Sequence, residues 1–265
     1  MKGLLIKSAI ASGIALSLAA VSRPAMAASF AVSIEDPGVQ NAQLSNLVNA
    51  HVQTFDGQTQ GYSAKGLQWN DGTQNIGNYQ NTLIMNADQF GGAGGDKQYF
   101  DVDTNRSGNG QTVSTLNLTK PQDYLGLWWS AGDSNNVLTF LSQGKVVQTV
   151  TTADVVSYIG KLANKASYYG NPNAPFKNND SSEPFAFINF YDVGGTFDQV
   201  KFSNIGGSGF ESDNHTIASG YKAITGHVVT AVPESSSVFG VLAIGLVGAA
   251  SVLKSQAKKK SMQLS

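Results

Sequence analysis

The sequence predicts an all-β protein: a single β-sandwich or jelly-roll-like ectodomain with one short helix, between an N-terminal signal peptide and a C-terminal single transmembrane helix. Glycine (29) and asparagine (21) are abundant among the 265 residues, and charged residues make up only 13%, which favours turns and strands over long helices. Short apolar runs alternate with turn residues about every 8–12 positions, which is the spacing of strands in a sandwich. Each end of the chain carries an apolar segment flanked by basic residues.

Residues 1–27 have the pattern of a secretory signal peptide. Two lysines form the positive N-terminal region, and residues 8–21 are uncharged and mostly apolar. Ala25 and Ala27 supply the small-x-small pattern of a signal peptidase site, so cleavage is expected after Ala27. We therefore expect the chain downstream to be exported.

Residues 28–230 are expected to form one ectodomain of short strands, without an internal repeat or domain boundary. Residues 124–129 and 185–191 carry large apolar groups on both faces, which places them inside a layered structure. The sequence SQGK at residues 142–145 predicts a tight hairpin turn. The expected strands are residues 30–34, 51–55, 82–85, 98–102, 112–118, 124–129, 137–141, 145–150, 185–191, 197–203 and 217–229.

One helix is expected after Thr151. Thr151 can act as the N-cap, and Asp154, three positions later, completes a variant of the capping box. The apolar residues that follow recur on one helical face. Residues 171–182 are rich in proline and asparagine and are expected to form a loop.

The C-terminal tail has three parts in a fixed order: a proline-containing motif, an uncharged apolar segment and a basic end. The apolar segment, with the serines before it, is long enough to span a membrane as a helix. The four lysines that follow would stay in the cytoplasm, which orients the ectodomain outward. Within residues 231–265, the parts are the motif at 232–235 (Val232, Pro233 and Glu234, then Ser235), the apolar helix at 238–253 and the basic end at 254–265.

This three-part tail resembles the PEP-CTERM sorting signal of exosortase-dependent surface proteins of Gram-negative bacteria. The family motif is usually Pro-Glu-Pro, and here Ser235 stands at the second proline position. The resemblance implies that an exosortase-type enzyme cuts near Pro233 and Glu234, after signal peptidase has acted at the N-terminus. It also implies a transient precursor in the inner membrane and a final location at the cell surface or outside the cell.

The ectodomain also resembles such surface proteins, in a family whose activity is unassigned. The similar segments lie between about residues 120 and 220 and include LGLWWSAGDSNNVLTF, EPFAFINFYD and GSGFESDNHT. This resemblance implies a surface protein, and it brings no catalytic residues to transfer.

Composition and motifs exclude several classes of function. The ectodomain holds 17 acidic and 10 basic residues, a net charge of −7, which argues against nucleic acid as a partner. The chain has no cysteine, no Gly-x-Ser-x-Gly elbow and no histidine pair with zinc spacing, so no catalytic residue is assigned. We expect a non-catalytic surface or matrix protein, with adhesion or exopolysaccharide association as its role. A carbohydrate-binding module, with or without calcium, is the alternative, and a glycan-active hydrolase is a more distant one.

Trp69 is the candidate ligand platform. It stands among polar residues (Gln68, Asn70 and Asp71) and is expected in an exposed loop, where its ring could stack on a sugar. Trp128 and Trp129 point to opposite faces of a predicted strand, and both are expected to pack in the core.

Asp101, Asp103 and Asn105 are a candidate calcium site, because they place oxygen ligands at alternate positions of a loop. Arg106 and Thr112 stand where a calcium loop of the EF-hand type has glycine and glutamate, so a polar turn without metal or other cofactor is the favoured interpretation. A second acidic cluster, ESDN at residues 211–214, could meet Glu35 and Asp36 near the first strand; only analogy with sugar-binding modules suggests this.

Overall fold

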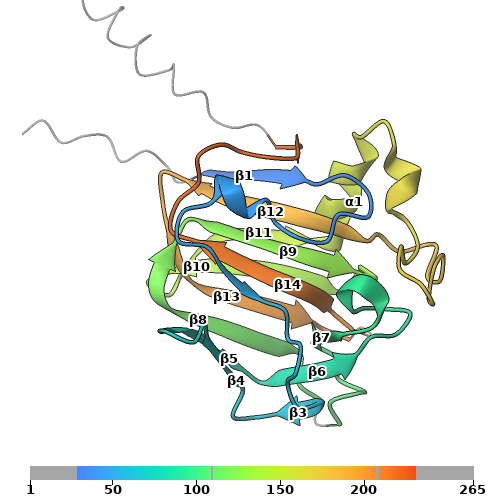
Figure 1. The fold of residues 1–265 in the computed structure, drawn as a ribbon, viewed down its shortest axis with the longest axis horizontal. Coiled ribbons are helices and arrows are strands. Elements are labelled where there is room, and N and C mark those ends of the chain that lie inside the picture. The colour runs from blue at the N-terminus through green and yellow to red at the C-terminus, as the bar shows by residue number, and fades with distance from the viewer. Residues whose placement is uncertain (1–28, 109, 207–208, 231–265) are drawn as a thin grey trace, which may run out of the picture.

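The computed structural model describes residues 29–108, 110–206 and 209–230. In these ranges, two antiparallel β-sheets pack face to face, with one α-helix and three short 3-10 helices in the connections (Figure 1). The prediction of a mostly β structure with one helix is confirmed. The signal peptide, with Ala25 and Ala27, and the tail from residue 231 onward lie outside the described residues.

The larger sheet has nine strands. In spatial order they are β15 (His227–Val228), β1 (Ser29–Ile34), β12 (Ala186–Val193), β9 (Tyr124–Ser130), β14 (Glu211–Ala218), β7 (Gln98–Asp101), β6 (Thr82–Asn86) and β3 (Gly61–Ser63), with β2 (His51–Gln53) paired to β14.

The smaller sheet has six strands. In spatial order they are β11 (Lys145–Thr151), β10 (Asn136–Ser142), β13 (Phe197–Asn204), β8 (Val113–Gln122), β5 (Asn75–Gln80) and β4 (Leu67–Asn70). The helices of the connections are η1 (Leu44–Asn46), η2 (Ala93–Gly95), α1 (Thr152–Gly160) and η3 (Lys165–Tyr168).

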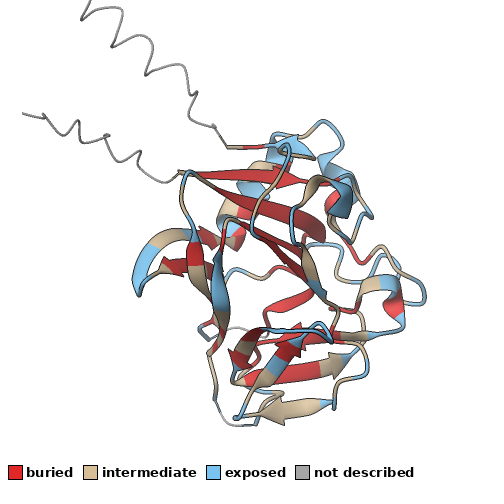
Figure 2. Ribbon diagram, turned by 60° about the vertical axis from the view of Figure 1, so that its left-hand side comes forward, coloured by how far each residue is buried: buried red, intermediate tan, exposed pale blue. Residues whose placement is uncertain are grey.

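The hydrophobic core lies between the two sheets (Figure 2). Aromatic rings from the two sheets contact each other across it, with centroids about 5 Å apart. The bridging pairs are Phe30 with Phe140 (4.8 Å), Phe100 with Phe202 (5.0 Å) and Phe140 with Phe190 (5.3 Å). Aromatic pairs at these separations contribute beyond their buried area, so the rings help to fix how the sheets face each other.

Loops cover the outer face of the larger sheet. Every residue of β9 and β14 is buried, although alternate residues point away from the core. Trp128 packs on this outer face near Phe90, and Tyr124 packs there near Tyr221. Both residues from the loops are partly buried, so the central strands are enclosed on both sides, as the two-faced apolar pattern of residues 124–129 predicted for β9.

The predicted hairpin and helix are confirmed. Gln143 and Gly144 both have positive φ angles (51° and 75°) between β10 and β11, as a two-residue hairpin turn requires. The Thr151 hydroxyl accepts a hydrogen bond from the Asp154 amide (3.2 Å), and an Asp154 carboxylate oxygen accepts one from the Thr151 amide (2.8 Å). These reciprocal bonds form the capping box that begins α1.

Two parts of the strand prediction are wrong. The short strands β3, β4 and β5 were not predicted, because glycine, asparagine and glutamine dominate them and give little apolar signal. The single strand expected over residues 217–229 is instead the end of β14, a connection and the two-residue β15. Burial under loops allows the polar residues at the start of β14 to form a central strand.

The two ends of the described chain lie together. β15 pairs with β1, and beyond it the Val229 amide donates to the Val32 carbonyl oxygen (2.9 Å). The Thr230 hydroxyl then accepts a hydrogen bond from the Val32 amide (2.8 Å). The chain therefore enters and leaves this domain at neighbouring positions of one antiparallel strand pair.

Candidate ligand-binding groove

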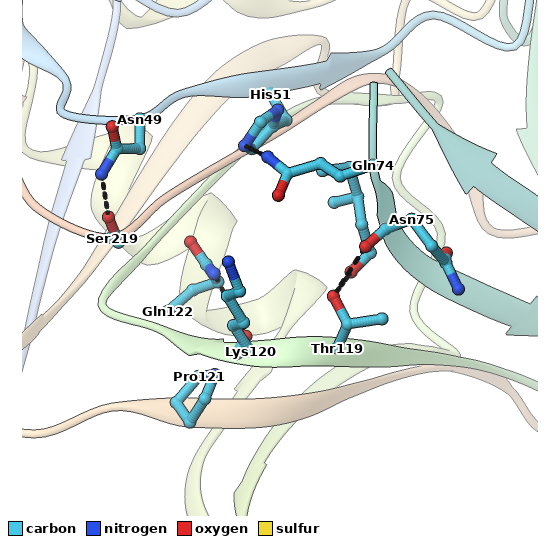
Figure 3. Close-up of a pocket in the computed structure, with 10 residues that line it drawn as sticks. Asn49, His51, Gln74, Asn75, Thr119, Lys120, Pro121, Gln122 and Ser219 are labelled. Carbon is cyan, nitrogen blue, oxygen red and sulfur yellow. Dashed lines mark hydrogen bonds between the residues drawn. The ribbon is translucent and has the colours of Figure 1, made fainter. Parts of the chain in front are cut away.

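A groove of about 370 Å³ opens where four separate parts of the chain meet (Figure 3). Its walls come from β2 and the residues before it, from the end of the β4–β5 turn and the start of β5, from the C-terminal end of β8, and from Ser219 directly after β14. Amide and hydroxyl side chains dominate the lining. The lining residues are Asn49, His51, Gln74, Asn75, Ile76, Thr119, Lys120, Pro121, Gln122 and Ser219.

One wall is held by Asp71, which lies just behind it. One Asp71 carboxylate oxygen accepts hydrogen bonds from the amides of Thr73 and Gln74 (2.9 Å each) and from the Thr73 hydroxyl (2.7 Å). These bonds stabilise the charged form and hold the pKa of Asp71 well below its usual value. The other oxygen lies 2.9 Å from His51 Nδ1. Asp71 therefore positions both His51 and Gln74, whose side-chain Nε2 atoms are 3.5 Å apart.

The opposite wall is the end of β8. Lys120 and Gln122 are two residues apart, so they share one side of the strand, and Figure 3 shows both projecting into the hollow toward His51 and Gln74. The Gln122 side chain is only 7% exposed. Its Nε2 donates to the Lys120 carbonyl oxygen (3.1 Å), whereas its Oε1 has no hydrogen-bond partner among the described residues. An unpaired buried acceptor costs about 1–3 kcal/mol. Because the oxygen itself is buried, a ligand donor would reach it and remove that cost only when the Gln122 side chain turns into the groove.

A local irregularity of the sheet shapes this wall. Pro121 has no amide hydrogen and cannot donate to a neighbouring strand, which confines proline in sheets to edges and bulges. The register between β8 and β13 shifts between Phe197 and Gln199, and Phe197 pairs with Gln122. On the other side, the Thr119 hydroxyl donates to the Asn75 carbonyl oxygen (2.8 Å) and ties β8 to the start of β5.

The charge of the groove differs from that of the domain around it. Its lining holds one lysine and one histidine but no aspartate or glutamate, whereas residues 28–230 carry a net charge of −7. The nearby Asp71 carboxylate is already occupied by His51 and the turn amides. The arrangement offers hydrogen bonds to hydroxyl groups and one accessible ammonium group, but it offers no carboxylate in the lining to act as a general acid or base.

Trp69 does not form the expected platform. It belongs to β4, is 1% exposed and stacks on Tyr79 with ring centroids 6.1 Å apart. The polar residues on either side of it are the outward positions of a strand, whose alternation resembles a polar loop in sequence. The expectation of an exposed loop is therefore wrong. Trp128 and Trp129 are buried, as predicted.

Asp101 and Asp103 both lie next to the Arg106 side chain. One Asp103 oxygen accepts hydrogen bonds from the amides of Asn105 (2.6 Å) and Arg106 (3.1 Å), which closes the favoured polar turn. The Arg106 guanidinium lies 3.3 Å from the other Asp103 oxygen and 3.6 Å from Asp101 Oδ2. A cation is therefore already present between these carboxyl groups. The described residues include no group of three or more histidine, aspartate or glutamate side chains that could hold a metal ion.

The second acidic cluster does not meet the first strand. Glu211 in β14 lies opposite Asp101 of β7, because Ser212 pairs with Phe100 in the adjacent position. Glu35 lies beyond β1, on the far side of β12 and β9, where its carboxylate accepts a hydrogen bond from Asn189 (2.9 Å). Burial raises the pKa of both Asp101 and Glu211. The expected meeting of residues 211–214 with Glu35 and Asp36 is therefore wrong.

The sorting motif of Val232, Pro233 and Glu234 and the apolar segment at 238–253 lie outside the described residues. Within the described ranges, no helix combines the length and apolar character needed to cross a membrane.

Comparisons with known proteins give one distant likeness. No protein-family model matches the sequence, and no curated protein matches it significantly. Among solved structures, the chain is similar to the K2 cleaved adhesin domain of Lys-gingipain, with 13% sequence identity and a TM-score of 0.35, over 65% of this chain and 99% of that one. At this TM-score the likeness carries no functional argument.

Proposed function

We propose that this protein is an exported, exosortase-sorted surface or matrix protein whose ectodomain binds exopolysaccharide without catalysis. Support for the sorting route comes from the sequence: a signal peptide pattern, the motif at Val232, Pro233 and Glu234, an apolar segment and a basic end follow in the family's order. In this proposal signal peptidase and an exosortase-type enzyme process the two ends, and the inner membrane holds the precursor only transiently.

The observation that carries the binding proposal is the composition of the groove. Sugars present many hydroxyl groups, each of which can donate and accept a hydrogen bond, and amide side chains do the same. Six of the ten lining side chains end in an amide or hydroxyl group, and Gln122 Oε1 lacks a partner. These features favour the carbohydrate-binding alternative as the way in which the surface protein acts. The lining supplies no carboxylate pair, so a hydrolase is not proposed.

The test is binding of polysaccharide by the full-length protein in detergent, measured by calorimetry against a panel of bacterial exopolysaccharides. Gln122→Met keeps the side-chain volume but removes the acceptor, and it is expected to weaken binding about three- to tenfold, the effect of one hydrogen bond. Gln148→Met is the matched control, because the Gln148 Nε2 also donates to a nearby backbone carbonyl oxygen (3.1 Å) but lies on β11, outside the groove. Equal binding by both variants and the wild type would place the ligand elsewhere.

A further inference from the structure

We propose that the groove selects a carboxylated sugar, a uronic acid unit of an otherwise hydroxyl-rich chain, and that Lys120 is the residue that recognises the carboxylate. This inference rests on the proposed function, since it names the class of polysaccharide that the same groove takes.

Lys120 carries an unpaired positive charge. Its side chain is exposed and projects into the groove (Figure 3), and no carboxylate of the described residues lies within salt-bridge distance of it. In a domain with 17 acidic and 10 basic residues, an ammonium group in a hollow without acidic lining is a local exception. A ligand carboxylate would meet an attractive charge here and no repulsive one within the lining.

Hydrogen-bonding side chains surround this charge. Gln122, on the same side of β8, has a buried and unpartnered Oε1, which a ligand hydroxyl group would satisfy when the side chain turns into the groove. Across the groove, His51 and Gln74 offer further hydrogen-bonding groups, held in place through Asp71. One positive charge beside several hydroxyl-binding groups matches a uronate, which combines one carboxylate with a ring of hydroxyl groups.

The cation in the groove is a lysine and not an arginine. Phosphate and sulfate groups are typically held by the forked guanidinium of arginine or by clustered backbone amides at a helix start. The groove lining has neither an arginine nor a helix N-terminus. A single lysine supplies one compact charge, which matches one carboxylate per sugar unit, and it lacks the fork that holds a phosphate or sulfate group through two parallel hydrogen bonds.

The experiment compares the full-length protein's affinity for short oligo-uronates with its affinity for the carboxyl-reduced oligosaccharides of the same linkage. Galacturonate, glucuronate and mannuronate oligomers form the panel. At least one acidic oligomer is expected to bind about five- to tenfold more tightly than its reduced counterpart, the effect of one partly exposed charged hydrogen bond. Lys120→Gln should abolish this preference, and Lys120→Arg should retain most of it.

Lys177→Gln is the matched control. Lys177 is an exposed lysine in the loop that leads to the start of β12, whereas the groove lies near that strand's other end. The Lys177→Gln substitution removes the same charge from the protein without changing the groove, so the preference for acidic oligomers should remain. Thermal melting checks that each variant is folded, which is expected because both lysines are exposed.

The outcomes separate this inference from the proposed function. Equal binding of acidic and reduced oligomers, with Gln122→Met still weakening both, would overturn the carboxylate inference and leave polysaccharide binding in place. If the preference for acidic oligomers persists in Lys120→Gln, another residue recognises the carboxylate, and the inference is also overturned. If no oligomer or polysaccharide binds, the proposed binding function fails together with the inference.

Discussion

The buried imidazole of His215 should make this protein lose stability in mild acid by a measurable amount. His215 lies in β14 inside a ring of aromatic side chains, and Phe202 stacks on it with centroids 4.9 Å apart. Its Nδ1 is 3.0 Å from the Tyr79 hydroxyl and its Nε2 is 2.9 Å from the Ser212 hydroxyl. Both neighbours are neutral hydroxyl groups, so nothing in contact with the ring compensates a positive charge.

Burial lowers the pKa of His215 from 6.5 to about 3. The unfolded chain therefore binds a proton at this residue near pH 6.5, while the folded protein does not until about pH 3. The contribution to stability is complete above pH 6.5 and declines as the pH falls toward the folded-state pKa. At pH 4.5, two units below the unfolded value, the loss is about 2.7 kcal/mol in the free energy of unfolding, at 1.36 kcal/mol per unit.

The assay is urea unfolding of the wild type and of His215→Gln at pH 7 and pH 4.5. Glutamine can bond to both hydroxyl groups but has no proton to gain in this range. Buried carboxyl groups such as Asp213, whose pKa burial raises to about 7, work in the opposite direction, since their contribution declines as the pH rises. They are present in both proteins and cancel in the difference.

The variant should gain about 2.7 kcal/mol relative to the wild type between pH 7 and pH 4.5. A difference that is constant between the two pH values would refute the reasoning, because His215 would then titrate equally in the folded and unfolded states. If His215→Gln does not fold, nuclear magnetic resonance of the wild-type imidazole gives the same answer: its ring should stay neutral at pH 4.5.

Two further predictions concern Arg106 and the tail. Arg106→Met removes the cation that faces Asp88, Asp101 and Asp103, and should lower the free energy of unfolding by about 3 kcal/mol, measured in urea. Because the pKa of Asp101 is raised, this carboxyl group is neutral at pH 5 and the loss should be smaller there than at pH 8; an equal loss would contradict the raised pKa of Asp101. For the tail, mass spectrometry of the surface form should find nothing after about residue 234, and Pro233→Ala with Glu234→Ala should leave the precursor in the membrane. Peptides from residues 255–265 in the surface form would show that the segment is a permanent anchor.

The sequence predicts those elements whose signal is local. The hairpin between β10 and β11 follows from two turn residues, and the start of α1 follows from Thr151 and Asp154. The two-faced apolar runs predict the enclosed strands β9 and β12. In each case the residues that decide the structure are neighbours in the chain.

The groove has no local signal. Its residues come from four segments that pairing between distant strands brings together, and amide side chains are as common in ordinary turns as in binding sites. The prediction for Trp69 failed for a related reason. An aromatic residue in a polar strand can point inward or outward, and only its contacts with distant strands decide which. His215 likewise gives no sign of its burial, since the aromatic residues that enclose it, such as Phe202 and Tyr79, come from strands distant in the chain.

The meeting of the two chain ends at β1 and β15 has a mechanical consequence. When tension is applied at adjacent ends of an antiparallel pair, it loads the cross-strand hydrogen bonds one after another instead of all together. β15 contributes only two paired residues, so a pull on the C-terminal end would load residues 226–230 first, at this edge of the sheet. The chain before them is held more firmly, because Tyr221 packs on Tyr191 and the Lys222 amide donates to the Asn46 carbonyl oxygen (2.8 Å). The five residues 226–230 could extend by roughly 17 Å, at about 3.3–3.6 Å per residue. Ser219, which lines the groove, lies in the part that stays held, so the groove would keep its shape while the edge strand detaches.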